Sequence, residues 1–227
     1  MAVTSSNNSL LSVVGDPRLK LLNGSTRQIS DSKYNVAPLW TCGIHVTRDQ
    51  KVVVGAVTTG TLFMGTGSQM VIVMDEKGIR VKQYELDNNK KPLFTFPYRI
   101  TSTGDGNICV VDVLDSSYRG RVVVLGQAGN IVQIYNGHHD VNSPEKPFRP
   151  SGIVTTPANN IVVADCDNHT LHILSCAGAV FIYIMTDDVG IRFPYSLALS
   201  GQGHLYIGCA TTDSVKAKLY QVQYSGL

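Results

Sequence analysis

The sequence predicts an all-β fold built from repeated four-stranded units, and three observations support this prediction. The chain of 227 residues is 43% hydrophobic and only 16% charged, which is typical of a folded chain with a core and excludes disordered chains and coiled coils. Its apolar runs are short, rich in Val and Ile, and bounded by Gly, Asn, Asp or Pro, as strands and tight turns are. A similar order of runs also recurs along the chain.

The recurring unit is clearest between residues 148 and 184, where four apolar runs follow one another. With Ile44, Ile100, Ile153 and Leu197 taken as equivalent points, the steps between units are 56, 53 and 44 residues. Periods of this length are typical of propeller blades, whereas helical hairpin repeats are shorter. We therefore expect a β-propeller of four-stranded antiparallel blades.

Within each unit, the second strand is almost continuously apolar, at residues 52–54, 108–111, 161–164 and 205–207. This pattern indicates a strand that is covered on both faces, as in blades packed face to face. Residues that tolerate positive φ join the first two strands at Asp105-Gly106, Asn159-Asn160 and Gln202-Gly203.

The two ends of the chain do not fill whole units. Residues 1–38 predict a partial blade and lead-in, with third and fourth strands at 18–22 and 25–29 but no complete first pair. Residues 39–227 predict the repeats, as units near 40–95, 96–147, 148–192 and 193–227, and the last unit lacks its fourth strand. One strand from each end could complete a shared blade and close the ring. The count is about five blades, and an incomplete ring is the alternative.

Charge, cysteines and hydropathy bear on the location of the protein. The 19 basic and 17 acidic residues form no block of like charge, so they imply neither nucleic acid nor an anionic membrane. Neither a secretory signal nor a membrane-spanning stretch is predicted. The five cysteines are odd in number and form no CxxC pair, which favours buried reduced thiols. We expect a cytoplasmic protein.

The third unit resembles the NHL repeat. The resemblance is carried by Arg149-Pro-Ser-Gly-Ile, by Asn160-Ile-Val-Val-Ala-Asp, and by Asn168-His169 shortly before Leu171. It fades in the neighbouring units, where the second keeps Val111-Asp112 and the fourth has Gly208-Cys209 instead of Ala-Asp.

From about residue 40 onward, the chain is similar to the C-terminal propeller of the tripartite-motif proteins, whose members act as ubiquitin ligases and use the propeller to choose the target. The resemblance implies a non-catalytic module for protein recognition, with any RING and B-box outside this chain. Rings in that family commonly have six blades, so this chain is also consistent with a fragment of such a ring.

Four residues of the repeat have a plain structural interpretation. Asp112 and Asp165 follow the buried second strand, where a carboxylate can accept backbone N–H groups of the next turn. Asn168 tolerates the left-handed conformation and can close that turn, and His169 can bridge to a neighbouring blade.

Candidate ligand-binding residues lie near the starts of the first strands. They are three arginines with aromatic neighbours: Arg99, Arg149 and Arg192, with Tyr98, Phe148 and Tyr195. If the repeat brings them to one face, they form a site for an acidic peptide or for single-stranded RNA. The alternative is separate rim arginines, each with a local carboxylate partner.

The sequence contains one dense group of possible metal ligands and no catalytic signature. His138-His139-Asp140 is the densest group of possible ligands, but adjacent side chains in a loop are expected to point apart, which favours a solvated loop. We expect no catalytic residue, no metal and no cofactor. A propeller enzyme of the lactonase or amidating-lyase type would need several ligands on the first strands, and these strands supply few beyond His45. Protein partners are therefore expected, RNA is the alternative, and neither a membrane nor a small-molecule cofactor is expected.

Overall fold

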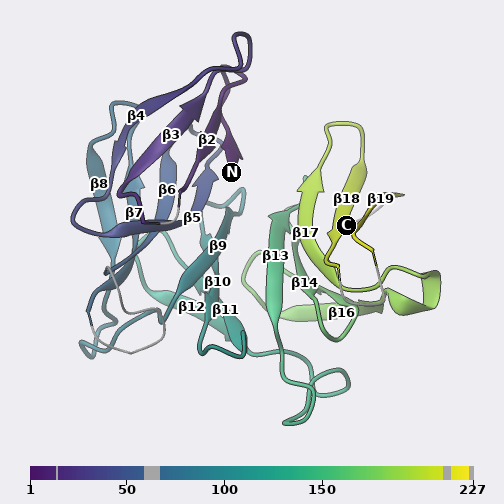
Figure 1. The fold of residues 1–227 in the computed structure, drawn as a ribbon. Helices are drawn as coiled ribbons and strands as arrows, with labels where there is room; N and C mark the ends of the chain where they lie inside the picture. Colours follow the sequence, from purple (N-terminus) through teal and green to yellow (C-terminus); the bar gives the residue numbers. More distant parts are fainter. Residues whose placement is uncertain (14, 59–66, 212–215, 225–227) are drawn as a thin grey trace. The chain divides into compact units, whose positions relative to one another are not determined.

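The computed structural model describes residues 1–13, 15–58, 67–211 and 216–224, and these form five antiparallel sheets (Figure 1). The predicted fold class is confirmed: the protein is an all-β chain with five blades of a β-propeller. A single 3-10 turn, η1 (Asp187–Val189), is the helical element among the described residues. In this part of the chain no helix is long and apolar enough to cross a membrane. The chain divides into two compact units, residues 1–101 and 102–227.

The first unit holds two complete sheets and the first strand of a third. The strands of the first two sheets are β1 (Ala2–Val3), β2 (Ser9–Leu11), β3 (Arg18–Leu22) and β4 (Ile29–Asn35), then β5 (Trp40–Val46), β6 (Val52–Val57), β7 (Gln69–Met74) and β8 (Arg80–Tyr84). The third sheet consists of β9 (Pro97–Ser102), β10 (Ile108–Val113), β11 (Gly120–Leu125) and β12 (Ile131–Tyr135). Each strand is hydrogen-bonded to its neighbour in the sequence, so every sheet is a meander.

The second unit contains most of the third sheet and the last two sheets. The fourth sheet consists of β13 (Pro150–Thr155), β14 (Ile161–Asp165), β15 (Thr170–Leu174) and β16 (Val180–Met185). The fifth consists of β17 (Pro194–Leu199), β18 (His204–Cys209) and β19 (Lys218–Gln223), which are its three strands among the described residues.

The first sheet corrects the prediction for the N-terminus. It has four strands of its own, whereas the sequence predicted only a third and a fourth strand there. Its fourth strand also begins at Ile29, where the predicted one ended. The first pair was missed because β1 and β2 have two and three residues, too few to form an apolar run. The first sheet therefore needs no strand from the other end of the chain.

The turn between the first and second strands is the same in all five sheets. It spans five residues, and its first N–H donates to its last carbonyl at 2.8–3.0 Å. The fourth residue has φ between +59° and +81°, a conformation that Gly and Asn adopt most easily. The first residue always bears a hydroxyl: Thr4, Thr47, Thr103, Thr156 and Ser200. In the last four of these turns, that hydroxyl accepts the N–H of the fifth residue at 3.0–3.2 Å.

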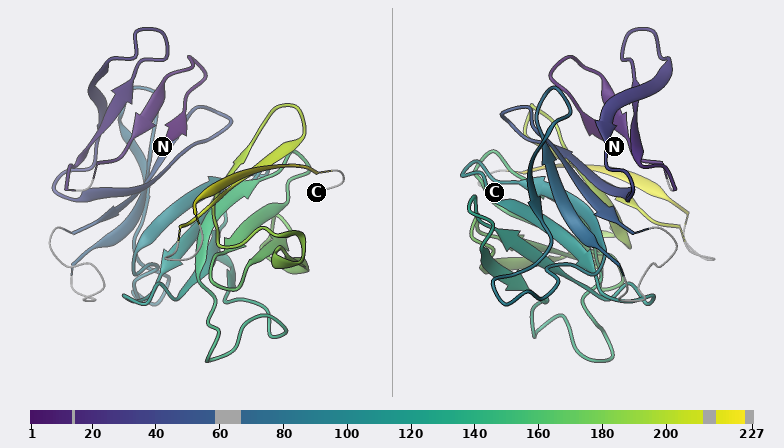
Figure 2. Two further views of the ribbon diagram at one scale, coloured as in Figure 1. Left: turned by 45° about the vertical axis from the view of Figure 1, so that its right-hand side comes forward. Right: turned by 90° about the vertical axis from the view of Figure 1, so that its left-hand side faces the viewer.

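The second strands of the second, third and fourth sheets lie in the core, whereas β2 and β18 are only partly buried. Every residue of β6, β10 and β14 is buried, as their continuous apolar runs predicted. In contrast, β18 alternates: Leu205, Ile207 and Cys209 are buried, and the residues between them are half-buried. The buried face of β18 joins Val162 and Ile173 in the apolar core between the fourth and fifth sheets, which lie face to face (Figure 2).

Candidate functional site at the rim of the fourth sheet

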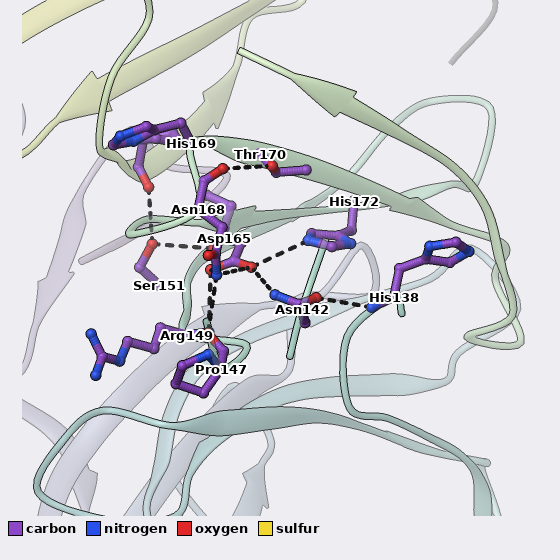
Figure 3. A network of polar contacts seen from close by, with 12 residues as sticks. His138, Asn142, Pro147, Arg149, Ser151, Asp165, Asn168, His169, Thr170 and His172 are labelled. Atoms are coloured by element: carbon purple, nitrogen blue, oxygen red, sulfur yellow. Dashed lines mark hydrogen bonds and ion pairs between the residues drawn. The ribbon is translucent and has the colours of Figure 1, made fainter. Parts of the chain in front are cut away.

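The carboxylate of Asp165 is the centre of a polar cluster at the end of β14. It has no exposed surface and accepts four hydrogen bonds (Figure 3). Asn142 Nδ2 donates to Oδ2 at 2.7 Å, the Arg149 backbone N–H donates to Oδ1 at 3.2 Å, and Asn168 Nδ2 lies within 3.0 Å of both oxygens. Asn142 and Arg149 belong to the loop before β13, and Asn168 to the turn after β14, so this one carboxylate holds both loops at the end of the sheet.

Asn168 and His169 extend the cluster in two directions. Asn168 Nδ2 also donates to the Pro147 carbonyl at 3.0 Å. The left-handed residue of this turn is His169, with φ of +51°, where the sequence had suggested Asn168. With its backbone so turned, His169 directs Nδ1 toward the next sheet, where it accepts the Phe193 N–H at 3.1 Å. This contact joins the fourth sheet to the segment that precedes β17.

Two further members of the cluster, Tyr135 and His172, were not predicted from the sequence. Tyr135 Oη and His172 Nδ1 are 2.8 Å apart, and His172 Nε2 lies 3.5 Å from Asp165 Oδ2. Burial raises the pKa of Tyr135, and the negative charge of Asp165 raises it further, so the phenol keeps its proton. The signal for His172 in the sequence was a histidine within the otherwise apolar run of β15, the third strand of this sheet.

The order tyrosine, histidine, aspartate is that of a catalytic relay, but its burial argues against catalysis. Neither Asp165 nor His172 has exposed surface, and the Phe148 ring packs edge-on against both Tyr135 and His172. No substrate can reach these atoms in this conformation. The arrangement instead supplies buried polar groups with partners, which stabilises the fold.

The equivalent carboxylate of the third sheet, Asp112 on β10, has a different environment. It is also fully buried, but it is paired with an arginine: Arg121 Nε and Nη2 both lie 2.9 Å from its Oδ2. Arg121 stands directly opposite on β11, and its side chain is 21% exposed.

The three predicted arginines occupy different places relative to their strands. Arg99 lies within β9, with its guanidinium 4.2 Å from the centre of the Tyr98 ring, whereas Arg149 and Arg192 precede β13 and β17. Arg149 forms an ion pair with Asp167, and Arg192 Nε lies 2.5 Å from Asp187 Oδ1. That the three share one face stays a prediction. Of the remaining aromatic neighbours, Phe148 is buried and Tyr195 is exposed.

Two pockets open on the second unit, and the first of them adjoins this cluster. The first, of about 410 Å³, is bounded by the loop before β13, the turn after β14 and the end of β16. Its charged residues are mostly acidic: Asp140, Glu145, Asp167 and Asp187, with Lys146 and Arg149. The second, of about 610 Å³, is mainly basic: its lining includes Arg192, Lys216, Lys218 and Tyr220, with Asp187 as its acidic residue.

Strand β16, at the edge of the fourth sheet, is unusually apolar for an outer strand. Phe181, Ile182, Ile184 and Met185 are between 39% and 56% exposed. Successive side chains of a strand point to opposite faces, so apolar groups are exposed on both faces of β16. The outer strand of the second sheet, β8, bears Arg80 and Lys82 instead.

The arrangement of the sheets defines the protein as a β-propeller. In agreement, residues 149–174 match the family model of the NHL repeat, so the chain contains this repeat. The match covers β13, β14 and β15, and it includes Asp165, Asn168 and His172. No curated protein sequence matches the chain.

Several solved structures share the fold. A catalytically inactive virginiamycin B lyase from Staphylococcus aureus, solved with quinupristin, is 12% identical, with a TM-score of 0.61 over 96% of this chain and 67% of that one. A putative gluconolactonase is 13% identical, with a TM-score of 0.61 over 98% and 74%. A chain of the mitotic checkpoint complex is 10% identical, with a TM-score of 0.62 over 92% and 56%. At these identities, the likeness concerns the fold alone.

Proposed function

We propose that this chain is a non-catalytic module for protein recognition, and that β16 binds an extended segment of the partner. The observation that carries this proposal is the apolar edge of β16. An edge strand offers unpaired N–H and C=O groups to an incoming strand, and most outer strands discourage such pairing with charged residues or Pro. β16 has neither, and its exposed side chains offer apolar contacts on both faces.

The surroundings of β16 suggest the chemistry of the bound segment. Met185, at the end of the strand, lines the smaller pocket, whose four acidic residues outnumber its two basic ones. An apolar segment with a basic residue at one end therefore complements this region. By the resemblance to tripartite-motif proteins, this chain selects the partner protein in the cytoplasm. Domains outside this chain then carry out the ubiquitin transfer.

A selection of linear peptides displayed on phage against the purified chain tests the proposal. We expect enriched peptides to be apolar with a basic residue, and to bind Ile182→Lys and Ile184→Lys variants about tenfold more weakly or worse. Val81→Lys, on the exposed outer strand β8, is the matched control and should bind as the wild type does. Thermal unfolding verifies that each variant is folded. Peptides that bind all four proteins equally, or the absence of any enriched peptide, would contradict the proposal.

Single-stranded RNA is a second candidate, because the larger pocket combines Arg192, Lys216 and Lys218 with Tyr220. Cations that track phosphates and a ring that stacks on bases are the usual features of such sites. RNA binding there would weaken steeply with added salt, because bound phosphates release counterions. Binding to oligouridine that does not change between low and high salt would exclude this mode. The lyase or lactonase alternative rests on the shared fold alone.

A further inference from the structure

The loop that leaves β12 brings three potential metal ligands together. The donor atoms of His138, His139 and Asp140 all lie within 4.8 Å of one another. His139 Nε2 is 3.1 Å from Asp140 Oδ1, and His138 Nδ1 is 3.7 Å from Asp140 Oδ2. The expectation that these adjacent side chains point apart is therefore wrong.

The backbone explains why they converge. The N–H groups of Val141 and Asn142 both donate to the His138 carbonyl, at 2.9 and 2.7 Å, which closes a tight turn over the three residues. Within this turn the imidazole rings of His138 and His139 stack with centres 4.5 Å apart. The turn requires glycine at position 137, because φ there is +101° and a Cβ would lie 2.4 Å from Asn142 Oδ1.

The turn is anchored to the fold at two points. The His138 N–H donates to Asn142 Oδ1 at 2.9 Å, while Asn142 Nδ2 donates to the buried Asp165 (Figure 3). On the other side, the Tyr183 hydroxyl donates to Asp140 Oδ2 at 3.2 Å, and its ring lies 5.0 Å from that of His138. Hydrogen-bonded outer partners of this kind orient metal ligands in proteins.

We propose that His138, His139 and Asp140 form a Zn²⁺ site. In a tetrahedral zinc shell with bonds of about 2.0–2.2 Å, donor atoms lie about 3.3 Å apart. The separations of 3.1 and 3.7 Å, which end on the two oxygens of Asp140, are close to this value. On binding the metal, His138 Nδ1 exchanges the Asp140 N–H that it accepts at 3.3 Å for the ion. Two imidazoles and one carboxylate favour Zn²⁺ over Mg²⁺ or Ca²⁺, which prefer oxygen ligands. The fourth position is left to water or to a side chain of a partner.

Titration calorimetry with ZnCl₂ on tag-free protein tests this site. We expect one Zn²⁺ per chain and no heat with MgCl₂. His139→Ala and Asp140→Asn should each weaken binding about tenfold or more. His204→Ala and Asp188→Asn, which remove a histidine and an exposed acid elsewhere in the second unit, should bind as the wild type does. Binding that persists unchanged in a His139→Ala/Asp140→Asn double variant would assign the zinc to other groups, such as thiols, and would overturn the proposal.

Two further measurements separate ligation from folding. Co²⁺ bound in place of Zn²⁺ should give the strong visible absorption of a tetrahedral site, and this band should disappear in Asp140→Asn. Asn142→Ala keeps all three ligands but frees the turn from Asp165, so it should weaken zinc binding while retaining the band. A weak octahedral spectrum in the wild type would contradict the proposed geometry.

Discussion

The third and fourth sheets hold a buried carboxylate at the end of the second strand, but they satisfy it in different ways. Asp112 faces Arg121 on the next strand, so a charge meets an opposite charge between segments that strand pairing already joins. Asp165 is held by neutral amides and a backbone N–H that come from the loop before β13 and the turn after β14. The same position of the repeat thus reinforces one sheet locally and, in the next, fixes the loops at its rim.

The difference has an energetic consequence. Arg121 is partly exposed and can turn to water if its partner is lost. The donors around Asp165 have less freedom, because Asn142 also accepts the His138 N–H and Asn168 also donates to the Pro147 carbonyl. A buried polar group that loses its partner costs more than the bond itself contributes. Asp165 should therefore matter more to stability than Asp112.

The largest expected effect is that of Asp165→Asn. The substitution keeps the size of the side chain but replaces one acceptor oxygen by an NH₂ group, which then faces the N–H donors of the cluster. We therefore expect a loss of about 3 kcal/mol in the free energy of unfolding. Asp112→Asn should cost about half as much. Urea unfolding followed by far-UV circular dichroism measures both, since the single tryptophan, Trp40, lies in the first unit. An Asp112 variant less stable than the Asp165 variant would reverse the comparison.

A smaller effect is expected for Asn168→Ala. It removes the Nδ2 donor shared by Asp165 and the Pro147 carbonyl, at a cost of about 1–2 kcal/mol. Gln202→Ala, at an exposed turn in the fifth sheet, serves as the control and should stay within about 0.5 kcal/mol of the wild type in the same urea titration. If the two variants were equally stable, the amide would contribute nothing to the cluster.

The smallest effect concerns two thiols, that of Cys109 on the strand of Asp112 and that of Cys166 next to Asp165 in the sequence. Burial raises the pKa of Cys109 and of Cys166 to about 12, and for Cys166 the charges of Asp167 and Asp165 contribute further. At pH 8 both thiols are protonated, so iodoacetamide should react slowly and faster as the pH rises. Asp165→Asn should speed the modification of Cys166 and leave Cys109 unchanged, as mass mapping of the peptides over time would reveal. Equal acceleration at both cysteines would indicate that the whole unit opens.

The sequence predicted the features that recur in each sheet and those that depend on residues close together in the chain. Runs of Val and Ile gave the buried second strands, and the motif located Asp165, Asn168 and His169. Tyr135 and Asn142 were not found, because their partners lie 37 and 23 residues further along the chain and no local pattern links them. The convergence of His138 with His139 depends on a backbone turn that the residue types do not specify. The signal for the first sheet was present at Thr4, in the hydroxyl turn that it shares with the other four sheets.

That turn also bears on how such a chain can grow. The N–H to C=O bond that closes the turn joins the first and last of five consecutive residues, so this bond needs no neighbouring sheet. The strands of a sheet follow one another in the sequence, and a sheet is therefore a contiguous cassette of the gene. Duplicating such a gene segment adds a blade together with the turn that joins its first two strands. The contacts of Asn142 and His169 reach beyond the strands of one sheet, so they must evolve separately.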